Sequence, residues 1–205
     1  MPAFHLKISR FIGPRSPVPV GGPNATRLVL MALAFSLLFF VTSIPAVLQR
    51  DVPGLVLLSS VVLGLGLSAL SVADVHAFRL PDALTLPLAG MGLLVAWLMG
   101  RGPLWWRSLS AGAGFLFLYA VERAYHRLRG RDGLGRGDAK LFAASGAWLG
   151  AEGLATVLLW ACGIALVTVL LAACFGHWLT RTTRLPFGPF LAFGTWLVWF
   201  YGPIG

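Results

Sequence analysis

Long runs of apolar residues separated by short polar joints account for most of the sequence. The first run covers 21 residues and as a helix would be about 31 Å long, enough to cross the hydrocarbon core of a bilayer. The fifth run is short, and we expect residues 135–138 to extend it or the segment to be half-inserted. The pattern predicts an all-α, polytopic transmembrane bundle of about seven segments. These segments are 28–48, 52–73, 83–99, 104–121, 139–149, 154–175 and 187–201.

The first 26 residues differ from the rest of the chain. They are rich in proline and glycine and carry Lys7, Arg10 and Arg15, which predicts a disordered cytoplasmic tail over 1–26. A cleaved signal peptide has a shorter basic region and a shorter apolar run, so we interpret the first run as a retained anchor. No repeat of fixed period is visible, and residues 27–205 are predicted to form one transmembrane domain.

Composition supports a membrane protein. Apolar residues make up 58% of the chain and charged residues 11%, whereas about a quarter of a soluble domain is charged. The mean hydropathy is +0.82. These values exclude an ordinary soluble globule and a disordered chain. Most of the eight tryptophans, Trp148, Trp196 and Trp199 among them, fall toward the ends of runs, which predicts aromatic belts at the bilayer surfaces.

The basic residues predict an orientation. The net charge is +9, and thirteen of the sixteen Lys and Arg residues fall on the side of the N-terminus if all seven runs cross the bilayer. By the positive-inside rule that side is the cytoplasm, and Gly205 is then outside. The largest cluster is a predicted basic loop over 123–140. The loop distribution accounts for the net charge, so we expect no nucleic-acid partner.

Two of the seven acids are candidates for chemistry. Asp74 ends the second run and Asp138 opens the fifth, so the predicted topology places both at the cytoplasmic ends of helices. Ionisable groups at membrane depth are costly and often functional. Two neighbouring carboxyls can share a proton and activate a water molecule. Position alone equally allows two interfacial acids that pair with Arg79 and Lys140.

The residues around these acids leave alternatives open. Gly135 and Gly137 precede Asp138, and glycine allows another chain segment to approach closely. A plain joint between a loop and a helix, with Asp138 as the N-cap, has the same appearance. Pro81 stops a helix, and Asp82 is predicted to cap the third run. Glu122 is predicted to be a local counter-charge of the basic loop.

Three segments in order resemble the type IV prepilin peptidases, bacterial leader peptidases of the aspartyl type. The first is Leu-Pro-Asp-Ala-Leu-Thr-Leu-Pro over 80–87, after Asp74. The second is Gly-Arg-Gly-Asp-Ala-Lys-Leu over 135–141, followed by Gly-Ala-Trp-Leu-Gly over 146–150. The third is Leu-Pro-Phe-Gly-Pro-Phe-Leu-Ala over 185–192. The resemblance implies that Asp74 and Asp138 are the catalytic pair. We expect supporting or substrate-binding roles for Pro81, Gly135, Gly137, Lys140, Pro186 and Gly188, although Pro186 and Gly188 could equally just end a loop.

The resemblance carries expectations about substrate and location. It implies a prepilin or pseudopilin precursor as substrate, with a short basic leader that ends in glycine before an apolar helix. It implies the bacterial inner membrane, with the active site at the cytoplasmic face and lipid as the surroundings. We expect no metal and no cofactor, because two carboxyls and a water molecule suffice for the hydrolysis.

Two departures from the family pattern affect these expectations. Many family members have another Asp two residues after the first catalytic one, where this chain has His76. Long members also carry an insert with paired CxxC motifs that supports N-methylation. The two cysteines here, Cys162 and Cys174, form no such motif. The resemblance therefore supports a short form with peptidase activity and without methyltransferase activity.

Two other functions remain as alternatives. An ion-coupled transporter would use the same aspartates as a proton or cation site, but transporters place acids near the middle of spans and have interrupted helices in matching halves. Neither feature is visible here. An inactive relative that binds prepilins without cutting them would also fit the motifs, although the presence of both aspartates argues against it.

Overall fold

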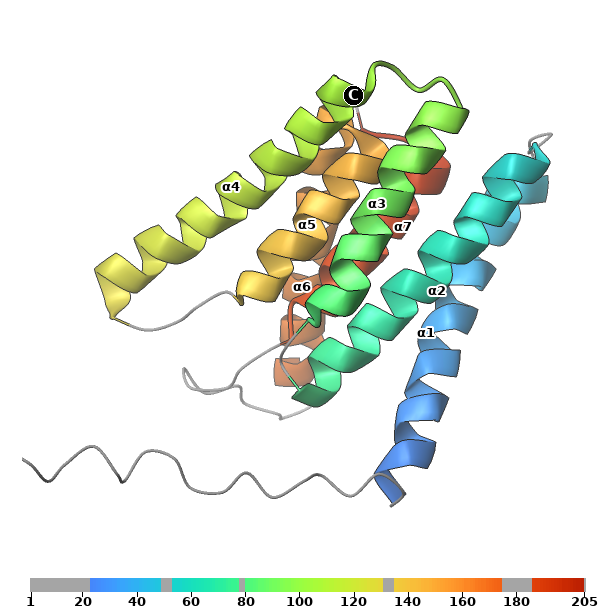
Figure 1. Cartoon of the computed structure of the whole chain (residues 1–205). Coiled ribbons are helices and arrows are strands. Elements are labelled where there is room, and N and C mark those ends of the chain that lie inside the picture. Colours follow the sequence, from blue (N-terminus) through green and yellow to red (C-terminus); the bar gives the residue numbers. More distant parts are fainter. Residues whose placement is uncertain (1–22, 49–52, 78–79, 131–134, 175–185, 205) are drawn as a thin grey trace, which may run out of the picture.

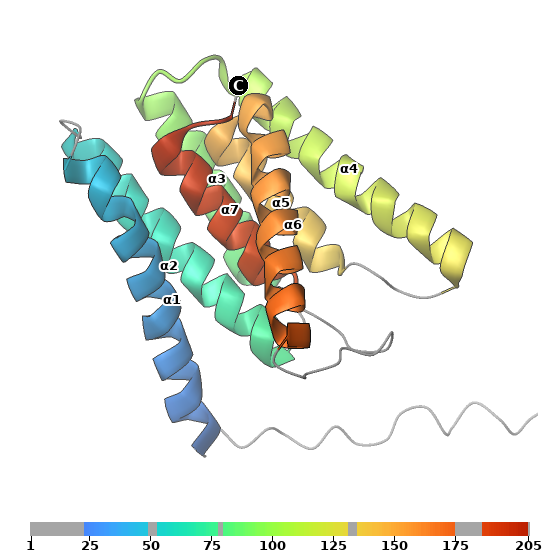
Figure 2. The same ribbon diagram turned by 180° about the vertical axis from the view of Figure 1, so that it is seen from behind.

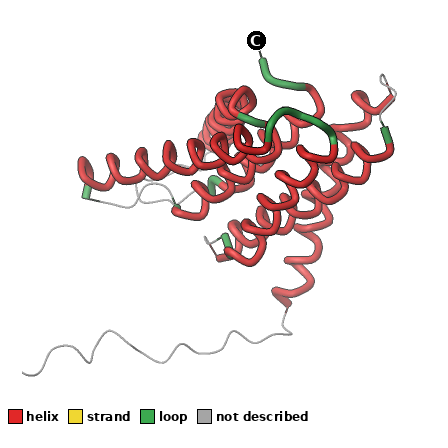
Figure 3. The backbone as a smooth tube through the Cα atoms, turned by 45° about the horizontal axis from the view of Figure 1, so that its top comes forward, coloured by secondary structure: helices red, strands yellow, loops and turns green. Residues whose placement is uncertain are grey.

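The computed structural model describes residues 23–48, 53–77, 80–130, 135–174 and 186–204, and every regular element in these ranges is an α-helix (Figure 1). In Figure 3 these helices are red and the described loops are green. The helices are α1 (Pro23–Leu48), α2 (Gly54–Ala77), α3 (Asp82–Leu98), α4 (Leu104–Arg129), α5 (Arg136–Leu149), α6 (Ala151–Cys174) and α7 (Gly188–Tyr201). Helix α4 is longer than predicted, and α5 begins within the predicted extension 135–138.

The prediction of one basic loop over 123–140 is wrong for most of its length. Helix α4 continues to Arg129, because no proline lies within it, and it ends at Gly130, whose φ of 64° is left-handed. Helix α5 then begins at Arg136. Most of the predicted loop is therefore helical. Helix α1 begins at Pro23, slightly before the end of the predicted tail, and the rest of that tail lies outside the described residues.

Two short helices form the centre of the bundle. Helices α5 and α7 each have 14 residues, about 21 Å of helix, and most of their side chains are buried. Helix α5 packs against α3, α4, α6 and α7, and α7 also packs against α1 and α2. In Figures 1 and 2, α1 and α4 lie at opposite edges with α5 and α7 between them. The longer helices therefore shield α5 and α7 from the surroundings.

The interior contains three of the tryptophans predicted for the interfacial belts. Trp148 and Trp196 are each only 1% exposed and Trp199 is also buried, so that prediction is wrong for them. The Trp148 indole donates a hydrogen bond to the Leu88 carbonyl at 2.8 Å, and the ring of Trp196 stacks on Phe39. A neighbouring helix backbone thus satisfies the buried N–H of Trp148, whereas that of Trp196 has no hydrogen-bond partner among the described residues.

The outer helices have the properties of membrane spans. Helices α2 and α6 are long and apolar enough to cross a bilayer by length and composition. Helix α3 and the segment Ala34–Val47 of α1 are apolar but shorter. Large apolar side chains such as Leu58, Leu65 and Leu159 are exposed on these helices. A soluble protein rarely exposes so much apolar surface, whereas hydrocarbon solvates it well.

One end of the bundle is closed by two arginines. The Arg107 side chain donates to the carbonyls of Arg101 and Trp148, at 3.0 and 3.1 Å. The Arg101 guanidinium lies over the Trp199 ring, 4.4 Å from its centroid. Burial and the nearby charge of Arg107 lower the pKa of Arg101. These contacts connect the α3–α4 loop to the C-terminal ends of α5 and α7.

The opposite end of the bundle is where α2 ends and where α3, α5 and α7 begin (Figure 1).

Polar contacts inside the bundle fix the relative positions of α2, α5 and α7. Ser145 of α5 and Thr195 of α7 are hydrogen-bonded at 2.6 Å, and Trp199 of α7 donates to Ser60 of α2 at 2.8 Å. Because such bonds are directional, α2, α5 and α7 cannot slide past one another without breaking them.

Candidate active site

Asp74 is buried in the last turn of α2 and is 5% exposed. Its Oδ2 accepts a hydrogen bond of 2.8 Å from the backbone N–H of Gly188, the first residue of α7. The first N–H groups of a helix have no partner within the helix, so a carboxylate satisfies one of them. A Cβ on Gly188 would lie 2.7 Å from the same Oδ2. The contact therefore requires glycine at this position.

Asp138 is buried to the same degree in the first turn of α5. The alternative in which Asp138 is the N-cap is wrong, because Gly135 occupies that position. Asp138 instead reaches back from the helix, and its Oδ2 accepts the N–H of Gly135 at 3.2 Å. Its Oδ1 is buried and has no hydrogen-bond partner among the described residues. A buried carboxyl oxygen without a partner is unusual and can accept a bond from a ligand or donate one when protonated.

The fold brings the two carboxyls into one electrostatic environment. The charge of Asp74 acts on Asp138, as does the charge of Glu122 from α4. Asp74 and Asp138 lie 64 positions apart in the chain. They meet because the C-terminal end of α2 and the N-terminal end of α5 occupy the same end of the bundle. Two buried carboxyls in this relation are equipped for general acid and base chemistry on one water molecule.

Gly137 allows the start of α5 to pack closely against the segment just before α3. A Cβ on Gly137 would lie 2.9 Å from the Cβ of Leu80 and 3.2 Å from its backbone nitrogen. The segment that approaches this glycine therefore belongs to the chain itself, just before α3. This contact brings the start of α5 against the start of α3. Gly135 is exposed, and its backbone N–H binds Asp138.

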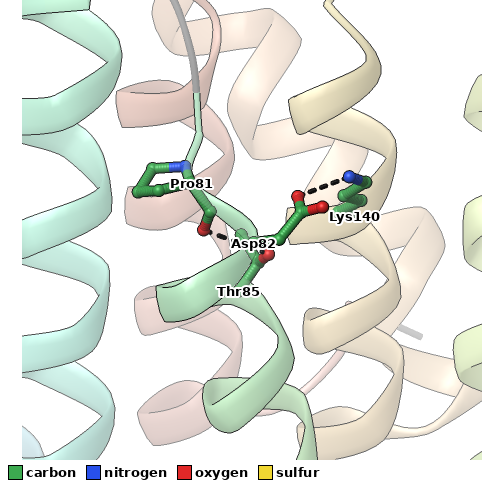
Figure 4. Close-up of polar contacts among 4 residues, drawn as sticks. All are labelled: Pro81, Asp82, Thr85 and Lys140. Carbon is green, nitrogen blue, oxygen red and sulfur yellow. Dashed lines mark hydrogen bonds and ion pairs between the residues drawn. The ribbon is translucent and has the colours of Figure 1, made fainter.

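The prediction that Asp82 caps the third helix is wrong. Pro81 occupies the N-cap position of α3, and no side chain caps this end. Asp82 is the first helical residue, and its carboxylate accepts a hydrogen bond from Lys140 of α5, as Figure 4 shows. Thr85 bonds back to the Pro81 carbonyl. The ion pair between α3 and α5 forms because both helices begin at this end, which local sequence signals do not reveal.

The same contact bears on the alternative in which the two acids pair with basic residues. Lys140 has Asp82 as its partner in the described structure, and Arg79 lies outside the described residues. Asp74 and Asp138 accept backbone N–H groups instead. Among the described residues, no salt bridge is found for either acid.

Glu122 reaches the site from α4. One of its carboxylate oxygens lies 3.8 Å from Nε of Arg136, and its side chain is 12% exposed. The prediction that Glu122 is a counter-charge of the basic stretch is therefore confirmed for Arg136. The other oxygen is buried and has no hydrogen-bond partner among the described residues. Sequence reasoning missed that Glu122 also lies near Asp138, because this proximity depends on the packing of α4 against α5.

The remaining predicted residues lie around this end of the bundle. Pro186 is half-buried and comes just before Phe187, the N-cap residue of α7. His76 is exposed on the last turn of α2, two residues after Asp74. In the part of the chain that the structure describes, no three His, Cys, Asp or Glu side chains form a group that could hold a metal ion.

Comparisons with known proteins show the family of the chain. A family model described as "Type IV leader peptidase family" matches residues 61–179, more than half of the chain. A "Prepilin leader peptidase/N-methyltransferase" from Aeromonas salmonicida (strain A449) is 39% identical over 156 residues, which is 73% of this chain and 51% of that protein. A protein of the same description from Burkholderia pseudomallei (strain 1026b) is 43% identical over 136 residues, 66% of this chain and 44% of that protein.

A third relative, from Xanthomonas campestris, has the same description and is 37% identical over 149 residues, 70% of this chain and 50% of that protein. The chain thus spans about half the length of the curated relatives it matches. No solved structure matches it. The matched region of the family model contains both Asp74 and Asp138.

Proposed function

This chain belongs to the type IV leader peptidase family, a family of polytopic membrane proteins, and on that premise we propose that it is a membrane-embedded aspartic endopeptidase. Its substrate is the precursor of a type IV pilin or pseudopilin, and it removes the leader. The names of the relatives support this choice of substrate. The single observation that carries the mechanism is the buried pair Asp74 and Asp138, in which one Asp138 oxygen has no hydrogen-bond partner among the described residues.

In the proposed mechanism one carboxyl is ionised and the other is protonated, with a water molecule between them. The ionised carboxylate takes a proton from the water molecule while the water oxygen attacks the scissile carbonyl carbon. The protonated carboxyl gives its proton to the carbonyl oxygen, which neutralises the developing negative charge. The carboxyl that received the water proton then gives it to the leaving amine as the C–N bond breaks. The carboxyl that had protonated the carbonyl oxygen takes a proton back from that hydroxyl group as the new carboxyl product forms. Both aspartates thus return to their initial protonation states.

Two features of the site support this chemistry. Burial excludes bulk water, and in such surroundings a shared proton and a charged intermediate interact strongly with the carboxyls. Backbone N–H groups of Gly188 and Gly135 hold one oxygen of each carboxyl, which fixes the orientation of the other. A geometry that is set before the substrate binds lowers the cost of reaching the transition state.

An ion-coupled transporter is less well supported. Both acids lie within one turn of a helix end, and α2 and α5 have no break near them. Transporters typically place ion sites at interrupted helices near the middle of the bilayer. An inactive relative that only binds precursors is the remaining alternative. Cleavage of a precursor by the wild-type protein would exclude it.

We place the protein in the bacterial inner membrane with seven crossings. The basic residues of the predicted topology put the N-terminus and the aspartate pair at the cytoplasmic side. This side is where newly made precursors expose their leaders. Lipid is then the partner of the exposed apolar faces of the outer helices.

The relatives carry a second activity in their names, N-methylation. We propose that this chain cleaves without methylating, because its two cysteines form no CxxC motif. Incubation of purified protein with a precursor and a methyl donor tests the proposal. The mature product is expected at the mass of an unmethylated N-terminus, and a methylated product would show that the transferase does not need paired cysteines.

The test of the mechanism compares wild-type protein with Asp74→Asn and Asp138→Asn on one precursor in membranes. Asparagine keeps the size of the side chain and removes its acid and base function. Each variant is expected to lose cleavage by at least about a thousandfold and to insert at wild-type levels. Substantial cleavage by either variant would rule out the two-aspartate mechanism. Binding of the precursor by a wild-type protein that does not cut it would favour the inactive relative.

A further inference from the structure

The environment of the aspartate pair is asymmetric. Asp74 accepts the N–H of Gly188 at 2.8 Å. This short hydrogen bond favours a negative charge on Asp74. Asp138 accepts a longer bond of 3.2 Å from Gly135 and keeps a second oxygen, Oδ1, buried and unpartnered. A protonated carboxyl can use that oxygen as a donor, whereas an ionised one would bury a charge without a partner.

A third carboxylate lies near Asp138. Glu122 comes from α4, which packs closely on α5, and its Oε2 is buried and lacks a hydrogen-bond partner within the described residues. Its Oε1 lies 3.8 Å from Nε of Arg136, whose side chain is 74% exposed. Water screens the exposed guanidinium and weakens its pairing with Glu122. Glu122 therefore lies where its negative charge favours the protonated form of Asp138, in addition to the larger effect of Asp74.

We propose that Glu122 is a positioning residue for the proton of the active site. Its negative charge keeps that proton on Asp138 and leaves Asp74 as the ionised carboxylate. This inference rests on the proposed function, since it assigns the acid role to Asp138 and the base role to Asp74. Several carboxyls in one buried site repel one another when all are ionised. Each carboxylate near Asp138 therefore makes the ionisation of Asp138 less favourable.

The other groups around Asp138 act on its proton in different ways. The N–H of Gly135, at the positive end of the α5 dipole, favours the ionised form. Helix α3 contributes Asp82, whose charge is paired with Lys140 of α5. Helix α7 contributes the N–H of Gly188, which binds Asp74 and not Asp138. Helix α6 begins beside the far end of α5, where its Glu152 acts on Arg107. The charge of Glu122 thus adds to that of Asp74 in favouring the protonated form of Asp138.

The activity test is the pH dependence of precursor cleavage by Glu122→Gln. Removal of the negative charge lets Asp138 lose its proton at lower pH, so cleavage fails earlier as the pH rises. We expect the alkaline limb of the kcat/KM profile to shift to lower pH by about half a unit. At a fixed pH on that limb, kcat/KM is then about threefold lower than in the wild type. Cleavage at acidic pH is expected to stay near the wild-type level. Glu122→Asp keeps the charge and is expected to return the profile most of the way to that of the wild type.

Glu152→Gln is the matched control, because it removes the same charge at the far end of α5, and its profile is expected to coincide with the wild type. A Glu122→Gln profile that coincides with the wild type would overturn the proposal. So would an equal loss at every pH, which is the result of a purely structural role. In contrast, cleavage by Asp74→Asn or Asp138→Asn overturns the proposed function itself.

A second readout does not depend on cleavage. The infrared band of a protonated carboxyl that disappears in Asp138→Asn reports the proton on Asp138 directly. In Glu122→Gln this band is expected to titrate away at a pH about half a unit lower than in the wild type. An unchanged midpoint, or a band that is lost in Asp74→Asn and kept in Asp138→Asn, would refute the assignment even if no precursor is cut.

Discussion

At the scale of single residues, Gly188 holds the most constrained position near the aspartate pair. It supplies the N–H that binds Asp74, and a Cβ there would lie 2.7 Å from the carboxylate oxygen and 3.0 Å from the carboxyl carbon. Neither atom is the end of a long flexible side chain, so the carboxyl or the start of α7 must move. The sequence marks this glycine through the motif at 185–192, but the reason for glycine lies in the contact with α2.

We predict that Gly188→Ala lowers kcat/KM for precursor cleavage by at least about tenfold, because small displacements of catalytic groups are costly. Gly90→Ala is the matched control, since no atom lies within 4 Å of an added Cβ there. Cleavage by purified proteins at equal concentration measures the effect. If Gly188→Ala cleaves within twofold of Gly90→Ala, the Asp74 carboxyl does not need its present position.

The pair formed by Asp82 and Lys140 leads to a prediction in the opposite direction. The lysine is half-buried and the aspartate is exposed, and exposed ion pairs contribute about 0–1 kcal/mol. We expect Asp82→Asn and Lys140→Gln each to cleave within about threefold of the wild type. The double variant is expected to be no worse than the more affected single variant, as for two residues that act through one contact. Complete loss with Asp82→Asn alone would mean that Asp82 belongs to the catalytic pair.

At the scale of elements, α4 and α5 depend on small residues where they meet. A Cβ on Gly146 would lie 2.7 Å from the backbone oxygen of Ser110 and 3.0 Å from the Cα of Ala111. Within a membrane, small residues allow helix backbones to approach closely, and van der Waals packing then holds them together. The proximity of Glu122 to Asp138 depends on this approach.

We therefore predict that Gly146→Ala destabilises the protein by about 1–3 kcal/mol, the usual cost of overpacking. The measurement is the thermal unfolding of the protein in detergent. Gly112→Ala in α4 serves as the control, since an added Cβ there has no atom within 4 Å. Equal melting temperatures for the two variants would show that the helices can separate at no cost.

At the scale of the whole molecule, the distribution of charge predicts the orientation in the bilayer. Thirteen of the sixteen basic residues lie on the N-terminal side if the chain crosses seven times. We predict that a reporter fused after Arg131 is cytoplasmic and that one fused after Gly205 is external. Alkaline phosphatase, which is active only outside the cytoplasm, and a fluorescent protein, which matures inside it, would measure the two positions. An external signal after Arg131 would place the aspartate pair on the wrong side for precursors.

The sequence by itself determined the class of the protein, its family and most helix positions. An apolar excess and runs of helical length leave few alternatives to a helical membrane protein, because lipid cannot satisfy a free backbone. The prediction of family membership from three ordered motifs is confirmed by the family match. The motifs also singled out Asp74 and Asp138, whose catalytic role stays a prediction. These features are encoded locally, so they can be recognised without a fold.

Only the tertiary structure decided which groups surround the two acids. The partner of Lys140 is Asp82, 58 positions away, and the partner of Asp74 is a backbone N–H 114 positions away. Glu122 comes near Asp138 because α4 continues to Arg129 and packs on α5. Trp148 and Trp196 entered the interior because the two short helices that carry them are central. Such contacts depend on which helix termini lie at the same end of the bundle. Packing between segments that are distant in the sequence determines this.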